Sequence, residues 1–336
     1  MSRDEPIMKT LVTGGTGFVG ANVVRMLLQR GTEVRALVRP RSDTQNLDQL
    51  DVELVAGDLR DRGSLEAALE GCDTVYHVAA MYALWAPSPK EIYDSNVTGT
   101  VNLLEAAGRA GVEKIVYTSS VATIGLPKDG TLGTEEVPLP PEDLVSDYKR
   151  SKYLAEQEVL QYVRRGLPVV IVNPSFPVGP WDVKPTPSGQ IIVNFLRGKI
   201  PAYVDTGLNV VDVEDVAIGH IMAAEKGRIG ERYILGHANL TLPELFQLLE
   251  QVSGMRAPRI RIPYGFAYLS ACVSECVART ITHRPPFVTL AGVRLSRKRM
   301  FFDASKAVRE LGLPQTPPVK ALSQAVQWFR AHGYVK

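Results

Sequence analysis

The sequence predicts an α/β fold, a doubly wound parallel sheet joined to a smaller, mostly helical C-terminal part. Three observations lead to this expectation. Apolar, β-branched segments alternate with helix-like segments over the first half of the chain. The first apolar segment, residues 9–13, runs directly into a glycine-rich turn, and the alternation loosens after Pro174. Alternation of this kind is typical of a parallel sheet covered by helices on both faces.

Each element is expected from its own stretch of sequence. Apolar runs predict strands at residues 8–13, 33–38, 52–56, 73–78, 113–118 and 168–173. Helices are expected between them, at residues 18–30, 63–70, 89–110 and 147–165. Short strands at residues 209–212 and 232–235 should rejoin the first part of the chain. The smaller part should contain helices at residues 187–198, 242–252, 264–281 and 318–332.

The glycine-rich turn at residues 14–20 predicts a binding site for a dinucleotide. Gly14 permits a tight turn, Gly17 lets a pyrophosphate approach the backbone, and Gly20 lets the helix pack on the strand. Free N–H groups at the start of the helix would then hold the anion. Because the turn lies between the first strand and a helix, a dinucleotide site is favoured over an ordinary strand–helix turn. The sheet is therefore expected to be Rossmann-type.

The end of the second predicted strand indicates which dinucleotide is bound. This end should lie beside the adenosine ribose, where a carboxylate would bind the 2′-hydroxyl of NAD. The chain instead has Arg39, Arg41 and Ser42. Two guanidinium groups and a hydroxyl suit a 2′-phosphate, because Arg binds phosphate in a bidentate manner. We therefore expect NADP(H) in preference to NAD(H); the alternative is a solvated basic loop whose charge Asp43 partly offsets.

The length of 336 residues fits two domains, or one large domain with an elaborated end. We expect residues 1–175 to form the Rossmann domain, which residues 209–237 rejoin. Residues 176–208 and 238–336 should form a substrate-binding cap. The cleft between the two parts is then the expected site for a small-molecule substrate.

A tyrosine and a lysine on one predicted helix suggest acid–base chemistry. Of the twelve tyrosines, Tyr148 alone has a lysine four residues later, Lys152. On a helix, this spacing puts both side chains on one face. An ammonium group beside the phenol is expected to lower its pKa from about 10, so that it exchanges protons with a substrate near neutral pH. The alternative is a surface pair with no role.

Two serines follow the fifth predicted strand, Ser119 and Ser120. The carboxyl ends of parallel strands form the edge of the sheet where ligands bind. A hydroxyl group at this edge can hydrogen-bond the reacting oxygen of a substrate and stabilise developing charge. A serine turn without function is the alternative.

Together, these features resemble the extended short-chain dehydrogenase/reductase family, or NAD-dependent epimerase/dehydratase family, over nearly the whole chain. The resemblance rests on the glycine turn, residues 57–59, residues 77–80, Asn96, the serine pair, Tyr148 with Lys152, residues 173–175 and residues 213–217. It implies that Ser120, five residues before Gly125, is catalytic with Tyr148 and Lys152, and leaves Ser119 as second choice. It also implies that Lys152 holds the nicotinamide ribose and that Asn96 supports the active-site network. The residues expected at the cofactor are Gly14, Thr16, Gly17, Phe18, Val19, Gly20, Arg39, Arg41, Ser42, Asp58, Leu59, Val78, Ala79, Ala80, Thr118, Lys152 and Pro174.

Within the family, the chain resembles hopanoid-associated sugar epimerases and dihydroflavonol 4-reductase-like proteins. Many nucleotide-sugar epimerases have an arginine seven residues before the match to Asp215, where it binds the substrate phosphates; this chain has Leu208 there. We therefore expect an NADP(H)-dependent oxidoreductase that acts on a carbonyl or secondary alcohol. The alternatives are an epimerase that oxidises and re-reduces its substrate on bound cofactor, and a non-catalytic cofactor-binding protein. Family resemblance further implies a homodimer.

Five residues are expected to contact the substrate, since they lie at the ligand edge of the sheet or follow its last main strand: Ser120, Tyr148, Ser175, Trp181 and Asn194. The apolar segment 266–277 could line the substrate pocket, form a dimer face or contact a membrane surface, but a buried cap helix is the preferred interpretation.

Composition excludes several other classes of function. The net charge of +2 gives no reason to expect nucleic acid as a partner. Three cysteines cannot form a metal framework, so no metal site is expected, and they fit a reducing, cytoplasmic location. We recognise no secretory signal, and no apolar run reaches the roughly 18 residues that a membrane-spanning helix requires.

Overall fold

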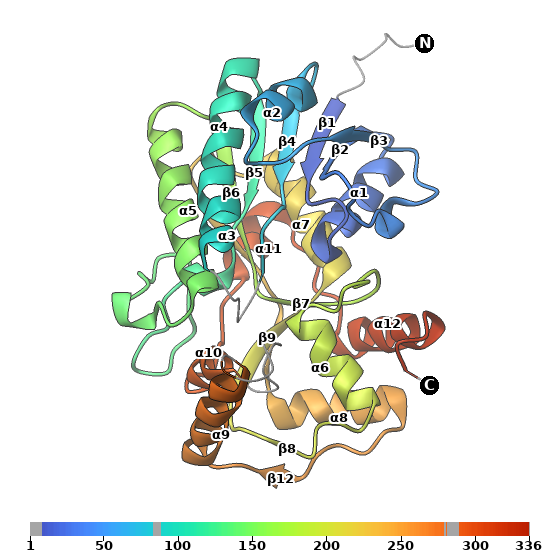
Figure 1. Cartoon of the computed structure of the whole chain (residues 1–336), viewed down its shortest axis with the longest axis vertical. Helices are drawn as coiled ribbons and strands as arrows, with labels where there is room; N and C mark the ends of the chain where they lie inside the picture. Colours follow the sequence, from blue (N-terminus) through green and yellow to red (C-terminus); the bar gives the residue numbers. More distant parts are fainter. Residues whose placement is uncertain (1–8, 83–88, 279, 281–288, 336) are drawn as a thin grey trace.

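The structure, a computed structural model, describes residues 9–82, 89–278, 280 and 289–335. Within these residues the main sheet has strands β1 (Lys9–Thr13), β2 (Glu33–Val38), β3 (Glu53–Ala56), β4 (Thr74–His77), β5 (Lys114–Thr118), β6 (Val169–Pro174) and β10 (Arg232–Leu235). All neighbouring strands pair in parallel, in the order β10-β6-β5-β4-β1-β2-β3 (Figure 1). The predicted doubly wound parallel sheet is confirmed.

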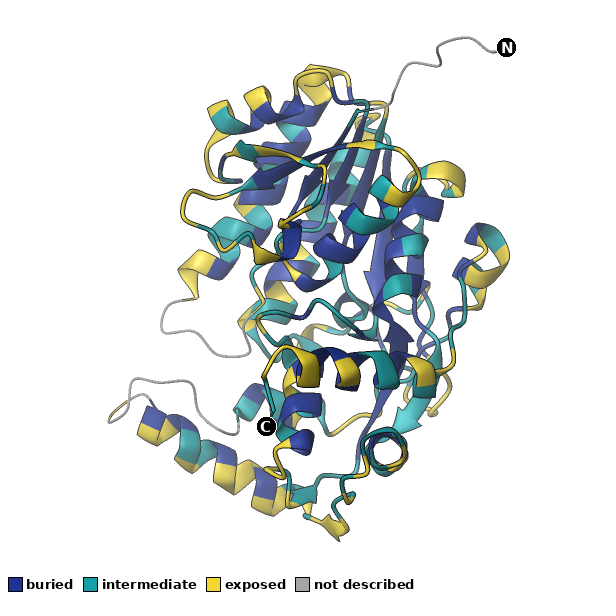
Figure 2. Ribbon diagram, turned by 90° about the vertical axis from the view of Figure 1, so that its right-hand side faces the viewer, coloured by how far each residue is buried: buried dark blue, intermediate teal, exposed yellow. Residues whose placement is uncertain are grey.

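Helices cover both faces of the main sheet. One face packs against α1 (Phe18–Gln29), α7 (Val213–Lys226) and α11 (Ser305–Leu311), and the other against α2 (Arg62–Leu69), α4 (Gly99–Ala110) and α5 (Asp147–Arg164). Successive strand residues point to opposite faces. Leu11 therefore joins one apolar core and Val12 the other, and both are fully buried. Figure 2 shows the buried sheet between helices whose outer faces are exposed.

The predicted helix at residues 89–110 is a helical run with an irregular middle. It consists of α3 (Lys90–Tyr93), the π-helical segment η2 (Asp94–Thr98) and α4. Short π-helical segments occur often at functional sites, because the extra residue changes which side chains face inward. Asn96, which lies in this segment, is buried.

The cap is built around a three-stranded sheet in the order β11-β9-β7, with bounds β7 (Phe176–Val178), β9 (Gly207–Asp212) and β11 (Ala238–Thr241). A separate apolar core joins this sheet to α6 (Pro187–Leu196), α8 (Leu242–Ser253) and α12 (Pro318–Ala331). The remaining elements are η1 (Gln45–Leu47), η3 (Val121–Thr123), η4 (Pro141–Asp143), β8 (Ala202–Tyr203), β12 (Ile260–Arg261), α9 (Tyr264–Val277) and α10 (Leu290–Leu295).

Two segments depart from the predicted division of the chain. The strand expected to rejoin the Rossmann part, β9, instead pairs with β7 and β11, where all six of its residues are buried. The second such strand, β10, does join the main sheet. Conversely, Phe302, Ala307 and Leu311 belong to the core cluster shared with α7, although they fall in the range assigned to the cap. The boundary at residue 175 remains a prediction.

Helix α9 is only half covered, so its preferred interpretation as a buried cap helix is wrong for one face. Ala267 and Ala271 are buried in a small cluster with α10, whereas Phe266, Leu269 and Val273 are 57–69% exposed. The predicted end of this helix, at residue 281, lies outside the described residues. Among the residues that are described, no helix combines the length and the hydropathy that crossing a membrane requires.

Candidate active site

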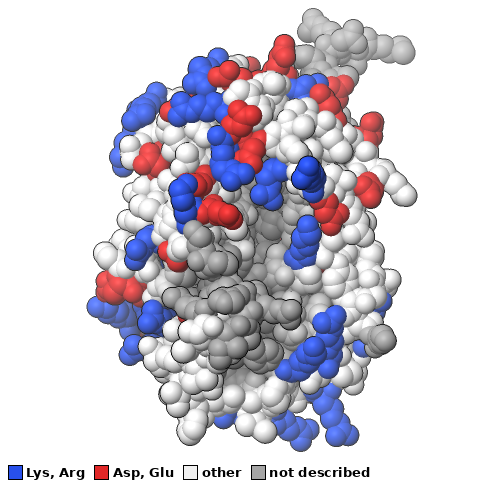
Figure 3. Space-filling view, in the orientation of Figure 1, with Lys and Arg blue, Asp and Glu red and all other residues white. Residues whose placement is uncertain are grey.

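A cavity of about 1970 Å³ lies along the carboxyl ends of the main strands. Its lining includes residues that follow β1, β2, β3, β4 and β5, and residues of α5 and of the cap. Figure 3 shows a hollow on this face with Lys and Arg side chains along its border. Because a single small molecule commonly occupies about 300–1,000 Å³, this cavity has room for a dinucleotide and a substrate together.

The glycine turn after β1 has the close packing that the sequence predicts. Gly14 has a φ of +74°, and a Cβ on it would lie 2.6 Å from the backbone nitrogen of Ala79. A Cβ on Gly20 would lie 2.1 Å from the Gly14 carbonyl oxygen. Neither position accepts a side chain, so the start of α1 lies directly on the turn. The first N–H groups of a helix have no partner within it, and here Gly17 and Phe18 line the cavity.

Two arginines follow β2 where the adenosine end of a cofactor is expected. Arg39 and Arg41 are exposed and line the cavity with Ser42. Asp43, which could offset their charge, lies 3.7 Å from Lys184 Nζ and accepts a hydrogen bond from the Gln45 backbone. The next acidic side chain along this edge, Asp58, forms an ion pair of 2.7 Å with Arg60. The end of β2 therefore presents two cations to the cavity.

The remaining residues predicted at the cofactor also line the cavity, and their contact with a cofactor stays a prediction. They are Thr16, Val19, Gly20, Asp58, Leu59, Val78, Ala79, Ala80, Thr118, Lys152 and Pro174.

The three predicted catalytic residues meet on one side of the cavity. Tyr148 and Lys152 lie on α5, one turn apart, and Ser120 is the residue before η3. Burial raises the pKa of the Tyr148 phenol to about 12, and a hydrogen bond with the Ser120 side chain opposes this rise. The ring of Tyr82 packs against Tyr148 with 4.2 Å between ring centroids. Ser120, which was preferred over Ser119 as the catalytic serine, thus lies beside the Tyr148 phenol.

One expectation about this group is wrong: the pKa of Tyr148 is raised, not lowered. The Lys152 Nζ donates a hydrogen bond of 2.6 Å to the Thr118 carbonyl oxygen and lies 4.8 Å from the ring centroid of Tyr117. Burial also lowers the pKa of Lys152 to about 8. Its ammonium group is therefore turned towards the end of β5, and desolvation dominates the ionisation of both side chains.

Asn96 occupies the supporting place that the family resemblance implies. Its side-chain amide donates hydrogen bonds of 3.0 Å to Ser151 Oγ and to the Met81 carbonyl, and its oxygen accepts one of 2.7 Å from the Met81 N–H. Ser151 in turn donates to the Tyr148 carbonyl. Asn96 thus ties the first turn of α5 to the segment after β4.

The substrate residues predicted from the sequence divide into two groups. Ser175 lines the cavity, and its hydroxyl is buried without a hydrogen-bond partner among the described residues. Trp181 and Asn194 do not line it, and their contact with a substrate stays a prediction. The Arg25 guanidinium covers the Trp181 ring at 3.5 Å, and Trp328 packs beside it. Asn194 hydrogen-bonds Gln190 along α6, whereas Ile191 of that helix does reach the cavity.

Sequence reasoning missed several residues that shape the site. Asn46, which is 3% exposed, donates hydrogen bonds to the carbonyl oxygens of Thr16 and Trp181 and thereby links the glycine turn to the cap. Glu156 and Arg232 lie behind Ser120. Of these residues, only Glu156 could have been found from the sequence, because its spacing of four residues from Lys152 puts both side chains on one face of the helix.

Comparison with known proteins agrees with this geometry. Residues 10–236 match the NAD dependent epimerase/dehydratase family. A dihydroflavonol 4-reductase-like protein of Synechocystis sp. is 50% identical over 97% of this chain and 95% of its own length. The sterol demethylase protein B of Methylococcus capsulatus is 39% identical over 98% of this chain and 100% of its own length.

Among solved structures, a nucleoside-diphosphate-sugar epimerase from Pseudomonas aeruginosa superimposes with a TM-score of 0.82 at 28% identity, covering 98% of this chain and 99% of the epimerase. The residues matched by the family, 10–236, include the glycine turn, the serine turn and α5, which together form the site. The chain therefore belongs to the NAD dependent epimerase/dehydratase family and is an enzyme of the extended short-chain dehydrogenase/reductase type.

Proposed function

We propose that the protein is an NADP(H)-dependent oxidoreductase that interconverts a carbonyl and a secondary alcohol, with Tyr148 as its general acid and base. The observation that carries this proposal is the meeting of Ser120, Tyr148 and Lys152 at a cavity that also contains the glycine turn. When bound, the nicotinamide cofactor supplies the hydride in reduction and accepts it in oxidation.

In the reductive direction, Tyr148 donates its phenolic proton to the carbonyl oxygen of the substrate. A phenol with a raised pKa is protonated at neutral pH, which is the form this step needs. Ser120 hydrogen-bonds the same oxygen and stabilises the negative charge that develops on it. Lys152, held by the Thr118 carbonyl at the end of β5, would bind the ribose hydroxyls of the cofactor.

The arginines after β2 support NADP(H) over NAD(H). Arg39 and Arg41 face the cavity, and the nearby carboxylates of Asp43 and Asp58 are engaged by Lys184 and Arg60. An exposed pair of guanidinium groups beside the expected ribose can bind a 2′-phosphate with charge-assisted hydrogen bonds.

The cap side of the cavity favours a bulky apolar substrate. Many of the described residues that line it are apolar or aromatic: Phe176, Ile191, Leu208, Leu242, Tyr264, Tyr268 and Met300. Such a lining binds ligands mainly by removing apolar surface from water. The names of the two relatives point to dihydroflavonol and sterol chemistry, which also concerns ring-rich molecules.

An epimerase that uses bound cofactor is the second candidate, because the Pseudomonas aeruginosa structure has that name and the same fold. The residue at the position of the phosphate-binding arginine argues against it. Leu208 lines the cavity and is only 7% exposed, so it presents an apolar surface where a sugar diphosphate would need a cation.

Net cofactor consumption separates the two candidates. We expect the protein to oxidise NADPH stoichiometrically when it is given bulky apolar ketones, of which phenanthrenequinone is the first probe and cyclic sterol ketones are the next. The absorbance of NADPH measures the reaction, and the alcohol product is identified by mass spectrometry. Interconversion of sugar nucleotide epimers without net NADPH loss would instead establish the epimerase.

The rate should depend on pH differently in the two directions. Since the raised pKa keeps Tyr148 protonated, reduction should be insensitive to pH between about 6 and 7.5. Oxidation needs the phenolate, whose fraction rises about tenfold per pH unit below the pKa, so oxidative kcat/KM should rise by a similar factor. This window stays below the pKa of Lys152, about 8, so most of the lysine remains charged. A flat oxidative profile would exclude a neutral Tyr148 as the proton carrier.

A further inference from the structure

A buried glutamate lies directly behind the serine turn and has no part in the proposed proton transfer. Glu156 follows Lys152 by one turn of α5 and is 1% exposed. It does not line the cavity, so it cannot contact a substrate or cofactor there. Burial of a carboxylate without partners costs several kcal/mol, so its presence calls for a set of matched donors.

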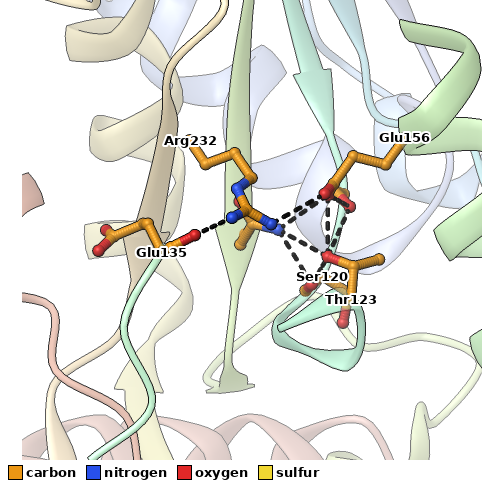
Figure 4. Close-up of polar contacts among 7 residues, drawn as sticks. Ser120, Thr123, Glu135, Glu156 and Arg232 are labelled. Atoms are coloured by element: carbon orange, nitrogen blue, oxygen red, sulfur yellow. Dashed lines mark hydrogen bonds and ion pairs between the residues drawn. The ribbon is translucent and has the colours of Figure 1, made fainter. Parts of the chain in front are cut away.

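Donors from two segments, the turn 119–123 and β6, converge on one carboxylate oxygen of Glu156. Ser119 Oγ and Thr123 Oγ1 donate hydrogen bonds of 2.5 and 2.8 Å to Oε2, and Asn173 Nδ2 donates one of 3.1 Å. The other oxygen, Oε1, forms an ion pair of 3.3 Å with Arg232 on β10. The guanidinium of Arg232 also donates to the Glu135 carbonyl (Figure 4). Both oxygens of the carboxylate thus have partners.

Two of these groups also lie within hydrogen-bond distance of Ser120, and the single hydroxyl proton of Thr123 is shared between Glu156 and the Ser120 carbonyl. Thr123 Oγ1 lies 2.8 Å and Asn173 Nδ2 lies 3.0 Å from the Ser120 carbonyl oxygen. The Glu156 network therefore fixes the backbone of Ser120. The side chain of the same residue hydrogen-bonds the Tyr148 phenol. Figure 4 shows Ser120 and Thr123 below Glu156 and Arg232 to its left.

We propose that Glu156, paired with Arg232, is a positioning residue that fixes the turn 119–123 and so sets the place of the Ser120 hydroxyl relative to Tyr148. The inference rests on the proposed function, since it assigns a role to Ser120 in that reaction. Because α5 contains both Glu156 and Tyr148, one helix determines the position of the acid and of its hydrogen-bonding partner.

The test variant is Glu156→Gln, which keeps the shape of the side chain. An amide cannot accept from three donors at one end and from Arg232 at the other, because one end is now an NH₂ group. We expect turnover of phenanthrenequinone to fall by about 10- to 100-fold, the scale of a misplaced catalytic group. Affinity for NADPH, measured by fluorescence titration, should stay at the wild-type value, since Glu156 lies outside the cavity.

A double-mutant cycle separates positioning from general stability. If Glu156 acts through Ser120, adding Glu156→Gln to Ser120→Ala should cause no further loss of rate. Equal loss in both backgrounds would overturn the inference. The matched control is Glu158→Gln, on the same helix, whose carboxylate contacts only Gln161 among the described residues; its rate should be unchanged.

Two further measurements keep the proposal falsifiable. A crystal structure of Glu156→Gln should show Ser120 displaced from Tyr148, and an undisturbed serine turn would contradict the proposal even without a substrate. If Glu156→Gln does not fold, Thr123→Val removes one donor to the Ser120 carbonyl and should show the same dependence on Ser120. Loss of activity in Tyr148→Phe with full activity in Glu156→Gln would overturn this inference alone, whereas full activity in Tyr148→Phe would overturn the proposed function.

Discussion

Replacement of Tyr148 by phenylalanine should lower turnover by roughly 10²- to 10⁴-fold, the range assigned to general acid–base catalysis. The substitution keeps the ring that packs against Tyr82 and removes only the hydroxyl that meets Ser120. The binding surface for the cofactor is therefore expected to remain intact. Stopped-flow measurement of NADPH oxidation gives the rate, and fluorescence titration gives the dissociation constant of NADPH.

The matched control for this variant is Tyr153→Phe. Tyr153 lies on the same helix but does not line the cavity, so its loss of a hydroxyl should leave the rate unchanged. Full turnover by Tyr148→Phe would contradict the proposed mechanism in both its reductase and epimerase forms, because both pass the proton through this phenol. A joint loss of rate and NADPH affinity would indicate a role for Tyr148 in binding rather than in proton transfer.

The main sheet could be predicted because its signals are local. Strands buried on both faces are continuous apolar runs, and the helices between them begin and end near the expected residues. The place of β9 could not be predicted in this way. Its residues are as apolar as those of a main strand, and only the pairing with β7 and β11, which are distant in sequence, decides its sheet.

The site was predictable where residue types follow a strand end or a helical spacing. The glycine turn, Ser120, Tyr148 and Lys152 all lie at the cavity. The role of Trp181 could not be decided from the sequence, because an aromatic side chain after the last strand suits a substrate wall and an interdomain contact equally well. In the structure, Arg25 and Trp328 lie against its ring. The pKa of Tyr148 was misjudged because sequence spacing gives the nearest cation but not the loss of solvation.

Substitution of Arg39 by aspartate should shift cofactor preference from NADPH towards NADH. Loss of one charge-assisted hydrogen bond to the 2′-phosphate should cost about 1.5–3 kcal/mol, which weakens NADPH binding about 10- to 150-fold. The new carboxylate can accept a hydrogen bond from the 2′-hydroxyl of NADH, so affinity for NADH should be kept or improved. Because Arg39 is exposed, the substitution should not disturb the core of the Rossmann part.

Salt dependence and a distant control decide whether this effect is local. Wild-type NADPH affinity should fall with ionic strength more steeply than that of Arg39→Asp, because the variant lacks a cation that meets the phosphate. Arg164→Asp, an exposed change at the far end of α5 and outside the cavity, alters the net charge equally and should keep the wild-type preference. Equal wild-type affinity for NADPH and NADH would refute the assignment of Arg39 and Arg41 to a 2′-phosphate. If Arg39→Asp keeps the wild-type preference and Arg41→Asp causes the shift, the phosphate lies beside Arg41. That residue has a φ of +67° in the turn after β2.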